Sequence, residues 1–142
     1  MNERQDQGSA AQSSLDPVQF RFHKFQHLRS SRDFQQIYDS GQRAGDAHLL
    51  IFARRNQLNI TRIGLSVSRK HGGAVQRNRR KRVLREAFRK LQHQLPIGLD
   101  LILIPRQGEL PLERELQLSL RRLTDKLISR LPQLEPPDAA GV

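Results

Sequence analysis

The sequence predicts a single domain of the α+β class, an α/β sandwich in which one sheet packs against its helices. Periodic segments follow one another in the order helix, strands, helix, strand, helix, as expected for that architecture. The chain has 142 residues, of which 36% are hydrophobic, so it can bury one modest core. We expect the domain at residues 19–131, between a disordered N-terminal tail at 1–18 and a flexible, Pro-rich C-terminal tail at 132–142. Within the domain, the basic, aromatic-rich stretch at 20–28 is expected to be extended.

A short helix is expected first, at about residues 31–40. Ser30 can cap its N-terminus, and Gly41 can end it. Helical spacing places Phe34 and Tyr38 one turn apart on the same side. From these residues alone, the two rings could simply pin the helix to the sheet, or they could offer a surface on which bases stack.

Two strands are expected next, at 47–55 and 60–68, with a turn between them. In the second strand, Ile63, Leu65 and Val67 alternate with small or polar residues, so one face is apolar and the other is nearly bare. A sheet with a bare polar face leaves room for a ligand to lie on it. The residues of that face are Arg62, Gly64, Ser66 and Ser68.

A long helix is expected at about residues 74–94, after the Gly72-Gly73 pair and before Pro96. The next segment, 99–104, is nearly all apolar, as in a strand covered on both faces. A last amphipathic helix is expected to open at Pro111, because leucines follow it at helical spacing.

The positive charge of the chain is concentrated in one segment. The whole sequence has 25 Lys and Arg against 14 Asp and Glu, a net charge of +11. Residues 62–90 hold eleven of the basic side chains and a single acid, Glu86, whereas the rest of the chain is nearly neutral. Such an excess indicates a polyanionic partner. Arg predominates over Lys, and guanidinium binds phosphate in a bidentate manner, so a nucleic acid is favoured over an acidic membrane surface.

The long basic helix has two distinct stripes. Leu84, Phe88 and Leu91 form a core stripe, and the second stripe faces away from it. Basic residues continue the core stripe backward into the first turns, so we expect these turns to project past the sheet with their cations exposed. Cations there oppose the helix dipole, each at a cost of roughly 0.3–1 kcal/mol, and Glu86 can relieve Arg82 and Lys90 at i±4 by only about a few tenths of a kcal/mol. A bound phosphate backbone would offset this cost, and an ordinary solvated basic face is disfavoured.

Several other classes are disfavoured by composition. The chain has no Cys, which excludes disulfides and thiolate zinc sites, and its purely apolar runs, such as 101–104, are far too short to span a bilayer. A soluble cytoplasmic protein without a membrane partner is expected. A protein-based nuclease site is also disfavoured, because Glu86 is the only acid between Asp46 and Asp100 and the five His residues show no firm metal-ligand pair.

The basic segment resembles the bacterial ribonuclease P protein family. It reads RIGLSVSRK at 62–70 and GGAVQRNRRKRVLREAFR at 72–89, and the latter matches the family's "RNR" helix, AV-x-RNR-x-KR-x-x-RE-AF. Phe34, Tyr38, Gly41 and the later strand and helix follow in the family's order, so the resemblance covers roughly residues 20–130.

The resemblance implies an αβββαβα domain with a four-stranded mixed sheet, like domain 2 of certain ribosomal proteins, and a left-handed βαβ crossover. It also implies that the chain is a cofactor of a catalytic RNA that uses Mg²⁺, held mainly by the RNA, to remove the 5′ leader of precursor tRNA. The partners would be that RNA subunit and precursor tRNA, with no further protein required and no catalytic or metal-ligating residue on this chain.

Two sets of site residues follow from the basic segment, the polar strand face and the resemblance. The set expected to bind the RNA subunit is Arg69, Lys70, Arg77, Asn78, Arg79, Arg80, Lys81, Arg82, Arg85 and Arg89. The set expected to bind the leader is Phe34, Tyr38, Phe52, Arg62, Ser66 and Ser68.

Two positions depart from the family pattern. His71 stands where the family usually has an aliphatic residue and is expected to be a loop residue or an extra phosphate contact, while Gly73 stands where Asn is common.

The main alternative is a purely structural RNA-binding protein, such as a ribosomal one, which would need no groove for a single strand. A membrane-surface helix is set aside, because its apolar stripe would be wide and edged with aromatic residues.

Overall fold

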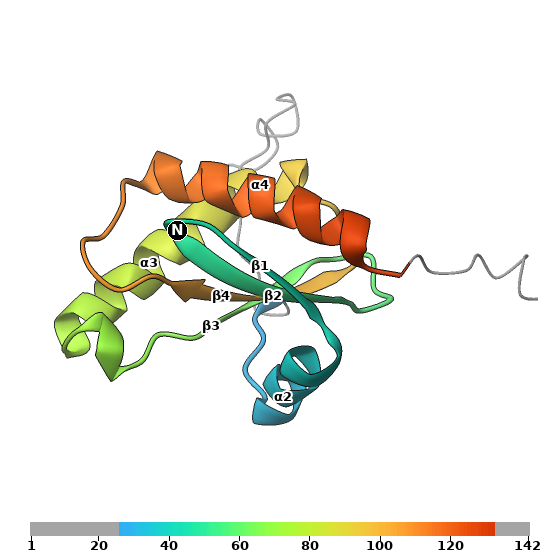
Figure 1. The fold of residues 1–142 in the computed structure, drawn as a ribbon, viewed down its shortest axis with the longest axis horizontal. Coiled ribbons are helices and arrows are strands. Elements are labelled where there is room, and N and C mark those ends of the chain that lie inside the picture. The colour runs from blue at the N-terminus through green and yellow to red at the C-terminus, as the bar shows by residue number, and fades with distance from the viewer. Residues whose placement is uncertain (1–25, 133–142) are drawn as a thin grey trace, which may run out of the picture.

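The computed structural model describes residues 26–132, which form three α-helices, two short 3₁₀-helices and one sheet (Figure 1). In chain order the elements are α2 (Ser31–Ser40), β1 (Gln42–Gly45), β2 (Leu49–Arg55), β3 (Arg62–Leu65), η3 (Arg69–His71), α3 (Ala74–Leu91), η4 (Gln92–Gln94), β4 (Leu99–Pro105) and α4 (Glu113–Arg130). This order confirms the predicted α+β class. The expected tails and most of the expected extended stretch at 20–28 lie outside the described residues.

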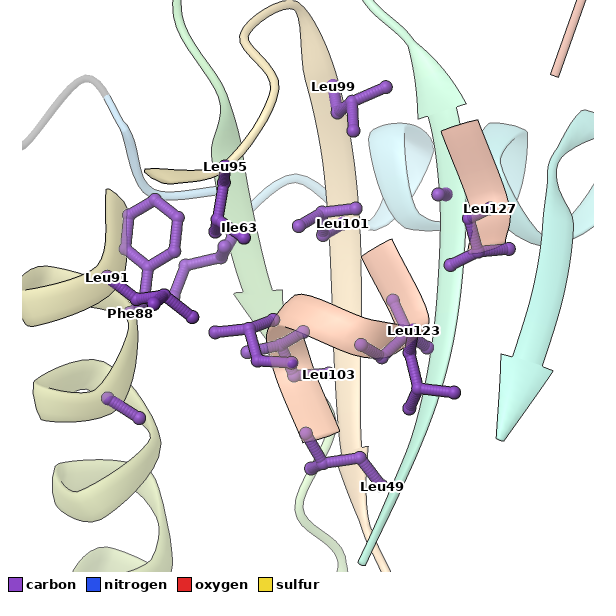
Figure 2. Packing of buried hydrophobic residues seen from close by; sticks show 14 of the residues in the cluster. Leu49, Ile63, Phe88, Leu91, Leu95, Leu99, Leu101, Leu103, Leu123 and Leu127 are labelled. Atoms are coloured by element: carbon purple, nitrogen blue, oxygen red, sulfur yellow. The ribbon is translucent and has the colours of Figure 1, made fainter. Parts of the chain in front are cut away.

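The sheet is mixed, with strand order β1-β2-β4-β3. β2 pairs antiparallel with both β1 and β4, whereas β3 and β4 are parallel neighbours joined through α3. In Figure 2 the sheet is seen from the side of α3 and α4, and β3 and β4 both point downward with β4 to the right of β3. The crossover is therefore left-handed, as the resemblance implied and against the strong general preference.

Helices cover both faces of the sheet. α3 and α4 lie on one face and α2 on the other (Figure 1). The main core lies under α3 and α4, where Phe88 of α3 and Leu123 of α4 pack over the fully buried Leu101 and Leu103 of β4 (Figure 2). Burial of side chains on both faces explains the nearly continuous apolar run of β4.

A smaller cluster fixes α2 to the opposite face. Ile37 is fully buried there with Leu28 and Ile102. The helix begins and ends as predicted, because the Ser30 hydroxyl accepts backbone N–H groups of the first turn and the Gly41 N–H donates to the Ile37 carbonyl. Gly41 is required by close packing, since a Cβ there would lie 2.5 Å from the carbonyl oxygen of Ala53.

The strands differ in length from those predicted. β2 begins at Leu49 rather than at residue 47, because the Asp46 carboxylate accepts the N–H groups of His48 and Leu49 and shapes the turn before it. β3 spans only Arg62–Leu65, although the Ser66 N–H still donates to the Leu103 carbonyl. Within residues 26–132, no helix is both long and apolar enough to cross a bilayer.

Candidate nucleic-acid interface

The outward side of α3 displays the basic residues that the sequence singled out. Asn78, Arg79, Arg82 and Arg85 are exposed, and Arg82 and Arg85 line a hollow of about 400 Å³ with Asn78 and Glu86. The first turn contains no acid, and its N-cap, Gly73, makes no side-chain capping bond. The helix N-terminus and the guanidinium groups therefore form one continuous positive surface, which we call the α3 basic face. It comprises Arg77, Asn78, Arg79, Lys81, Arg82, Arg85 and Arg89.

Glu86 neutralises one member of this face. Its carboxylate accepts from Arg89 Nε at 2.9 Å and Nη2 at 2.8 Å, and these hydrogen bonds lower the pKa of Glu86 and raise that of Arg89. The Glu86 carboxylate turns to the arginine three residues on rather than to Arg82 at i−4, although the nearby charge of Lys90 still helps to lower the pKa of Glu86. Lys90 pairs instead with Glu113 at 2.9 Å. In the described part of the chain, no carboxylate forms an ion pair with Arg82.

Arg80 does not share the exposure expected for the first turns of this helix. It is buried, and its guanidinium donates to the backbone carbonyls of His71, Arg106 and Gly108. The prediction that its side chain projects outward with the other cations is wrong. Because it continues the core stripe, Arg80 instead ties α3 to η3 and to the loop after β4. Arg77 and Lys81, which continue the same stripe, are half-buried, whereas Arg79 and Arg82 are exposed.

His71 is a buried part of the same attachment. Its Nδ1 accepts the Ser68 N–H at 3.0 Å, and its Nε2 lies 2.6 Å from the Pro105 carbonyl oxygen. An accepting Nδ1 requires the tautomer with its proton on Nε2, so the imidazole that fits both bonds is neutral. The expectation of a loop residue or phosphate contact is wrong, since the ring is occupied inside the protein. The turn that it holds presents Arg69 and Lys70 as exposed side chains.

Three rings gather on the opposite face of the sheet. The centroids of Tyr38 and Phe52 are 4.9 Å apart with the planes at 85°, and those of Phe34 and Tyr38 are 6.4 Å apart at 65°. All three are half-buried against the cluster under α2, so part of each ring stays accessible. We call Phe34, Tyr38 and Phe52 the aromatic cluster.

Phe34 also pins α2 to β3, as the simpler reading of the sequence allowed. A Cβ on Gly64 would lie 2.4 Å from Phe34 Cζ, so the ring rests directly on the glycine backbone. The predicted bare strand face is therefore wrong at Gly64, which is covered. Farther along the same segment, Ser66 is half-buried and the exposed Ser68 uses its hydroxyl to cap η3.

Arg62 is held by a buried carboxylate. Asp100 is fully buried, and its oxygens accept from Arg62 Nε and Nη2, both at 2.8 Å. Arg54 Nη2 lies 3.3 Å from the same carboxylate, and Asn56 Nδ2 donates to it at 2.9 Å. The hydrogen bond to Asp100, opposed by desolvation, raises the pKa of Arg62. Sequence reasoning missed Asp100 and Arg54, although one acid within an apolar strand signals a buried ion pair.

The described residues bring together no group of three or more His, Asp or Glu side chains that could hold a metal ion. The one fully buried carboxylate, Asp100, is already engaged by two arginines and an asparagine. The described surface therefore offers cations and rings for binding an anionic strand, but no assembled metal site.

Comparison with known proteins identifies the family. The ribonuclease P family profile matches residues 22–128. The ribonuclease P protein component of Vibrio vulnificus is 39% identical over 113 residues, which cover 79% of this chain and 92% of that protein. That of Thermotoga petrophila is 35% identical over 114 residues, covering 80% and 96%.

Solved structures agree in fold. The ribonuclease P protein of Thermotoga maritima superposes with a TM-score of 0.59 at 32% identity, covering 75% of this chain and 98% of that one. The Staphylococcus aureus protein gives 0.62 at 31% identity, covering 71% and 94%. The chain therefore belongs to the ribonuclease P protein family, the protein components of a tRNA-processing endonuclease.

Proposed function

We propose that this chain binds the catalytic RNA subunit of ribonuclease P through the α3 basic face and the 5′ leader of precursor tRNA through the aromatic cluster. The observation that carries the proposal is the exposure of Arg82 and Arg85 with no carboxylate of the described chain paired to Arg82. Folding alone gains nothing from such a surface, whereas an RNA backbone supplies the missing negative charge.

The α3 basic face suits a phosphate backbone in two ways. The guanidinium groups of Arg82 and Arg85, which line the same hollow, can each bind a phosphate through two hydrogen bonds. The uncapped N-terminus of α3 at Gly73 offers backbone N–H groups to a further phosphate. Arg69 and Lys70 extend the same surface from η3. Arg80 acts differently in this proposal, because it positions the helix from inside rather than touching RNA.

The aromatic cluster suits a single strand of any sequence. Base stacking on an accessible ring contributes roughly 1–3 kcal/mol per base and requires no particular base. Tyr38 and Phe52 stand nearly perpendicular, so together they form a corner rather than a flat sheet. Arg62 lies on the same face and is held in one orientation by Asp100, while Ser66 and Ser68 lie beyond the end of β3. This arrangement fits a subunit that must accept many leaders.

The chemical step is assigned in this proposal to the RNA partner. Mg²⁺ held mainly by the RNA would activate the attacking water and stabilise the leaving oxygen. The residues of this chain bind and orient the two RNA strands, and none is given a catalytic role. No further protein partner is invoked.

The decisive experiment is reconstitution. The purified protein is added to the ribonuclease P RNA at a Mg²⁺ concentration too low for the RNA alone, and cleavage of a precursor tRNA to the mature 5′ end is followed. Restored cleavage is expected with the wild-type protein, and much less with Arg82→Ala/Arg85→Ala. No restoration by a correctly folded wild-type protein would sink the proposal.

The competing function is that of a structural RNA-binding protein without a leader groove. The substitutions Tyr38→Leu and Phe52→Leu distinguish the two functions, because they remove the aromatic rings but keep apolar volume in the cluster between α2 and the sheet. The proposal requires that the holoenzyme lose affinity for precursor tRNA at least several-fold while its affinity for mature tRNA stays unchanged. Equal loss for both substrates would favour the structural role.

A further inference from the structure

The open edge of β3 carries a small pocket that joins Lys81 and Arg85 of the α3 basic face to two residues, His27 and Arg29, that belong to neither predicted binding set. It is enclosed between the segment that precedes α2 and the outer side of α3, with a volume of about 110 Å³. That volume equals roughly three or four water molecules, so it can hold a single phosphate group but not a nucleoside. The charged and titratable side chains that line it are His27, Arg29, Lys81 and Arg85.

The pocket is built by a short addition to the sheet. His27 forms a parallel bridge with Ile63, and the Leu28 N–H donates to the Ile63 carbonyl at 2.7 Å. Leu28 is buried in the cluster under α2. Because side chains alternate along an extended segment, His27 and Arg29 turn the other way, toward Lys81 and Arg85 of α3. The four side chains therefore converge from two separate elements.

The strand edge contributes a donor of its own. The Ser66 N–H points toward β4, where it bonds to the Leu103 carbonyl. Backbone groups alternate along a strand, so the N–H of Leu65, which lines the pocket, is directed to the open edge. An N–H group at the floor and cations around the rim form a cradle that is complementary to an oxyanion.

Among the described residues that line this pocket there is no acid. The imidazole of His27 faces Arg29 from its own segment and Lys81 and Arg85 from α3. Burial, followed by the positive charges of Arg29 and Arg85, lowers the pKa of His27 below its ordinary value. These surroundings therefore disfavour protonation of His27 until an anion binds in the pocket.

We propose that the β3-edge pocket binds one phosphate group of an RNA strand that crosses from the α3 basic face to the side of the sheet that carries α2. The proposal rests on the proposed function, since it gives the RNA a fixed point between the two surfaces. Arg29 and Lys81 hold the phosphate from opposite walls, and His27 becomes protonated as the phosphate enters. Binding at this pocket therefore strengthens as the pH falls through the titration range of His27.

The first test uses His27 as a local reporter. Its imidazole signals are titrated with pH by NMR in the intact protein, without ligand, with inorganic phosphate and with a short single-stranded RNA. His48, which lies in the turn before β2 away from the pocket, is the internal control. The pKa of His27 is expected to rise with either ligand, and that of His48 to move much less. A shift of both histidines by the same amount would indicate general screening and overturn the pocket.

The second test compares two variants that lose the same charge. Arg29→Gln removes a wall of the pocket, whereas Arg114→Gln removes an exposed cation from α4. Arg29→Gln is expected to reduce the log–log salt slope of RNA binding by about one unit, and Arg114→Gln to leave it unchanged. Wild-type slopes in both variants would overturn the proposal that this pocket binds a phosphate, while leaving the proposed function intact. A wild-type protein that fails to bind RNA would instead refute the proposed function, and the phosphate titration of His27 would still decide the pocket.

Discussion

Asp100 shows how one buried residue organises an exposed charge. A fully buried carboxylate is costly unless it is paired, and here two guanidinium groups and an amide satisfy it. Arg54 and Arg62 remain about a fifth exposed, at 22% and 23%. The same ion pairs that permit burial of Asp100 therefore fix two cations on the face that carries the aromatic cluster.

Replacing Asp100 should damage the fold rather than only the surface. Asp100→Asn leaves the two arginines facing each other without their carboxylate, and we expect a loss of about 3 kcal/mol in the free energy of unfolding. The measurement is urea denaturation followed by circular dichroism. Asp125→Asn, at an exposed position of α4, is the control and should change stability by less than about 0.5 kcal/mol. A small and equal effect of both substitutions would show that Asp100 is not the organising residue.

Asp46 links stability to pH. Burial raises its pKa, but the backbone N–H groups of Leu49 and His48 and the side chain of Arg122 outweigh burial and hold the pKa far below its ordinary value of 3.8. A carboxyl whose pKa is lowered by folding contributes stability above its unfolded pKa and loses it as the pH falls through the folded pKa. This contribution is therefore complete at neutral pH and declines only below about pH 4.

The corresponding experiment compares wild type with Asp46→Ala across pH. We expect the variant to be about 2 kcal/mol less stable at pH 7, because two backbone donors lose a charged acceptor. The difference should stay constant down to about pH 4 and shrink at lower pH, where the wild-type carboxyl becomes protonated. Stability curves that remain parallel well below pH 3 would contradict the role assigned to Asp46.

At the scale of elements, α2 and α3 were predictable because their signals are local. Ser30 and Gly41 directly flank α2 and mark its two ends, and the apolar spacing along α3 marks its core stripe. β1 was missed by pattern, since only Ala44 of its four residues is buried and no alternation can be seen. The shortening of β3 was equally hidden, because Ser68 leaves the strand to cap η3.

Arg80 was misplaced for a physical reason that also lies at this scale. On a helical wheel Arg80 belongs to the core stripe, and we expected its side chain to avoid burial because the first turns of the helix would project past the sheet. The structure satisfies it instead with the carbonyl oxygen of His71 at the end of η3 and with carbonyl oxygens of the loop after β4, at residues 106–108. Such carbonyls carry no signature in the sequence, so only tertiary structure could reveal them.

α3 therefore contains one arginine that supports the fold among several that we propose bind RNA. Arg80→Met is expected to lower the free energy of unfolding by about 2 kcal/mol, because three carbonyl acceptors lose a charged donor. Arg82→Met, two residues on and exposed, should leave stability within about 0.5 kcal/mol of wild type but weaken RNA binding. Thermal unfolding and a filter-binding assay on both variants provide the measurements. Destabilisation by Arg82→Met instead would mean that the two stripes of the helix have been exchanged.

At the scale of the whole molecule, the sheet separates two kinds of surface and its β3 edge joins them. α3, which carries the basic face, lies with α4 on one side of the sheet, and α2, which carries Phe34 and Tyr38 of the aromatic cluster, lies on the other (Figure 1). The concentration of positive charge in residues 62–90 could be predicted from the sequence, because charged residues can be counted without knowledge of the structure. The left-handed crossover that places α3 beside β3 could come only from the family resemblance, since hydrophobic periodicity is the same for either hand.

The concentrated charge predicts how RNA affinity depends on salt. If some six phosphates are engaged, the logarithm of the association constant should fall with the logarithm of salt concentration with a slope of about −4 to −5. The measurement is RNA binding across a series of KCl concentrations at fixed Mg²⁺ and pH. Arg82→Ala/Arg85→Ala should flatten the slope by about two units, because each removed phosphate contact releases one fewer counterion. The exposed pair Arg114→Ala/Arg121→Ala on α4 has the same net charge and should keep the wild-type slope, because counterion release counts contacts rather than total charge. Equal flattening by both pairs would mean that the RNA senses only the overall field of the protein, and a slope near zero in the wild type would mean that phosphates are not what this protein binds.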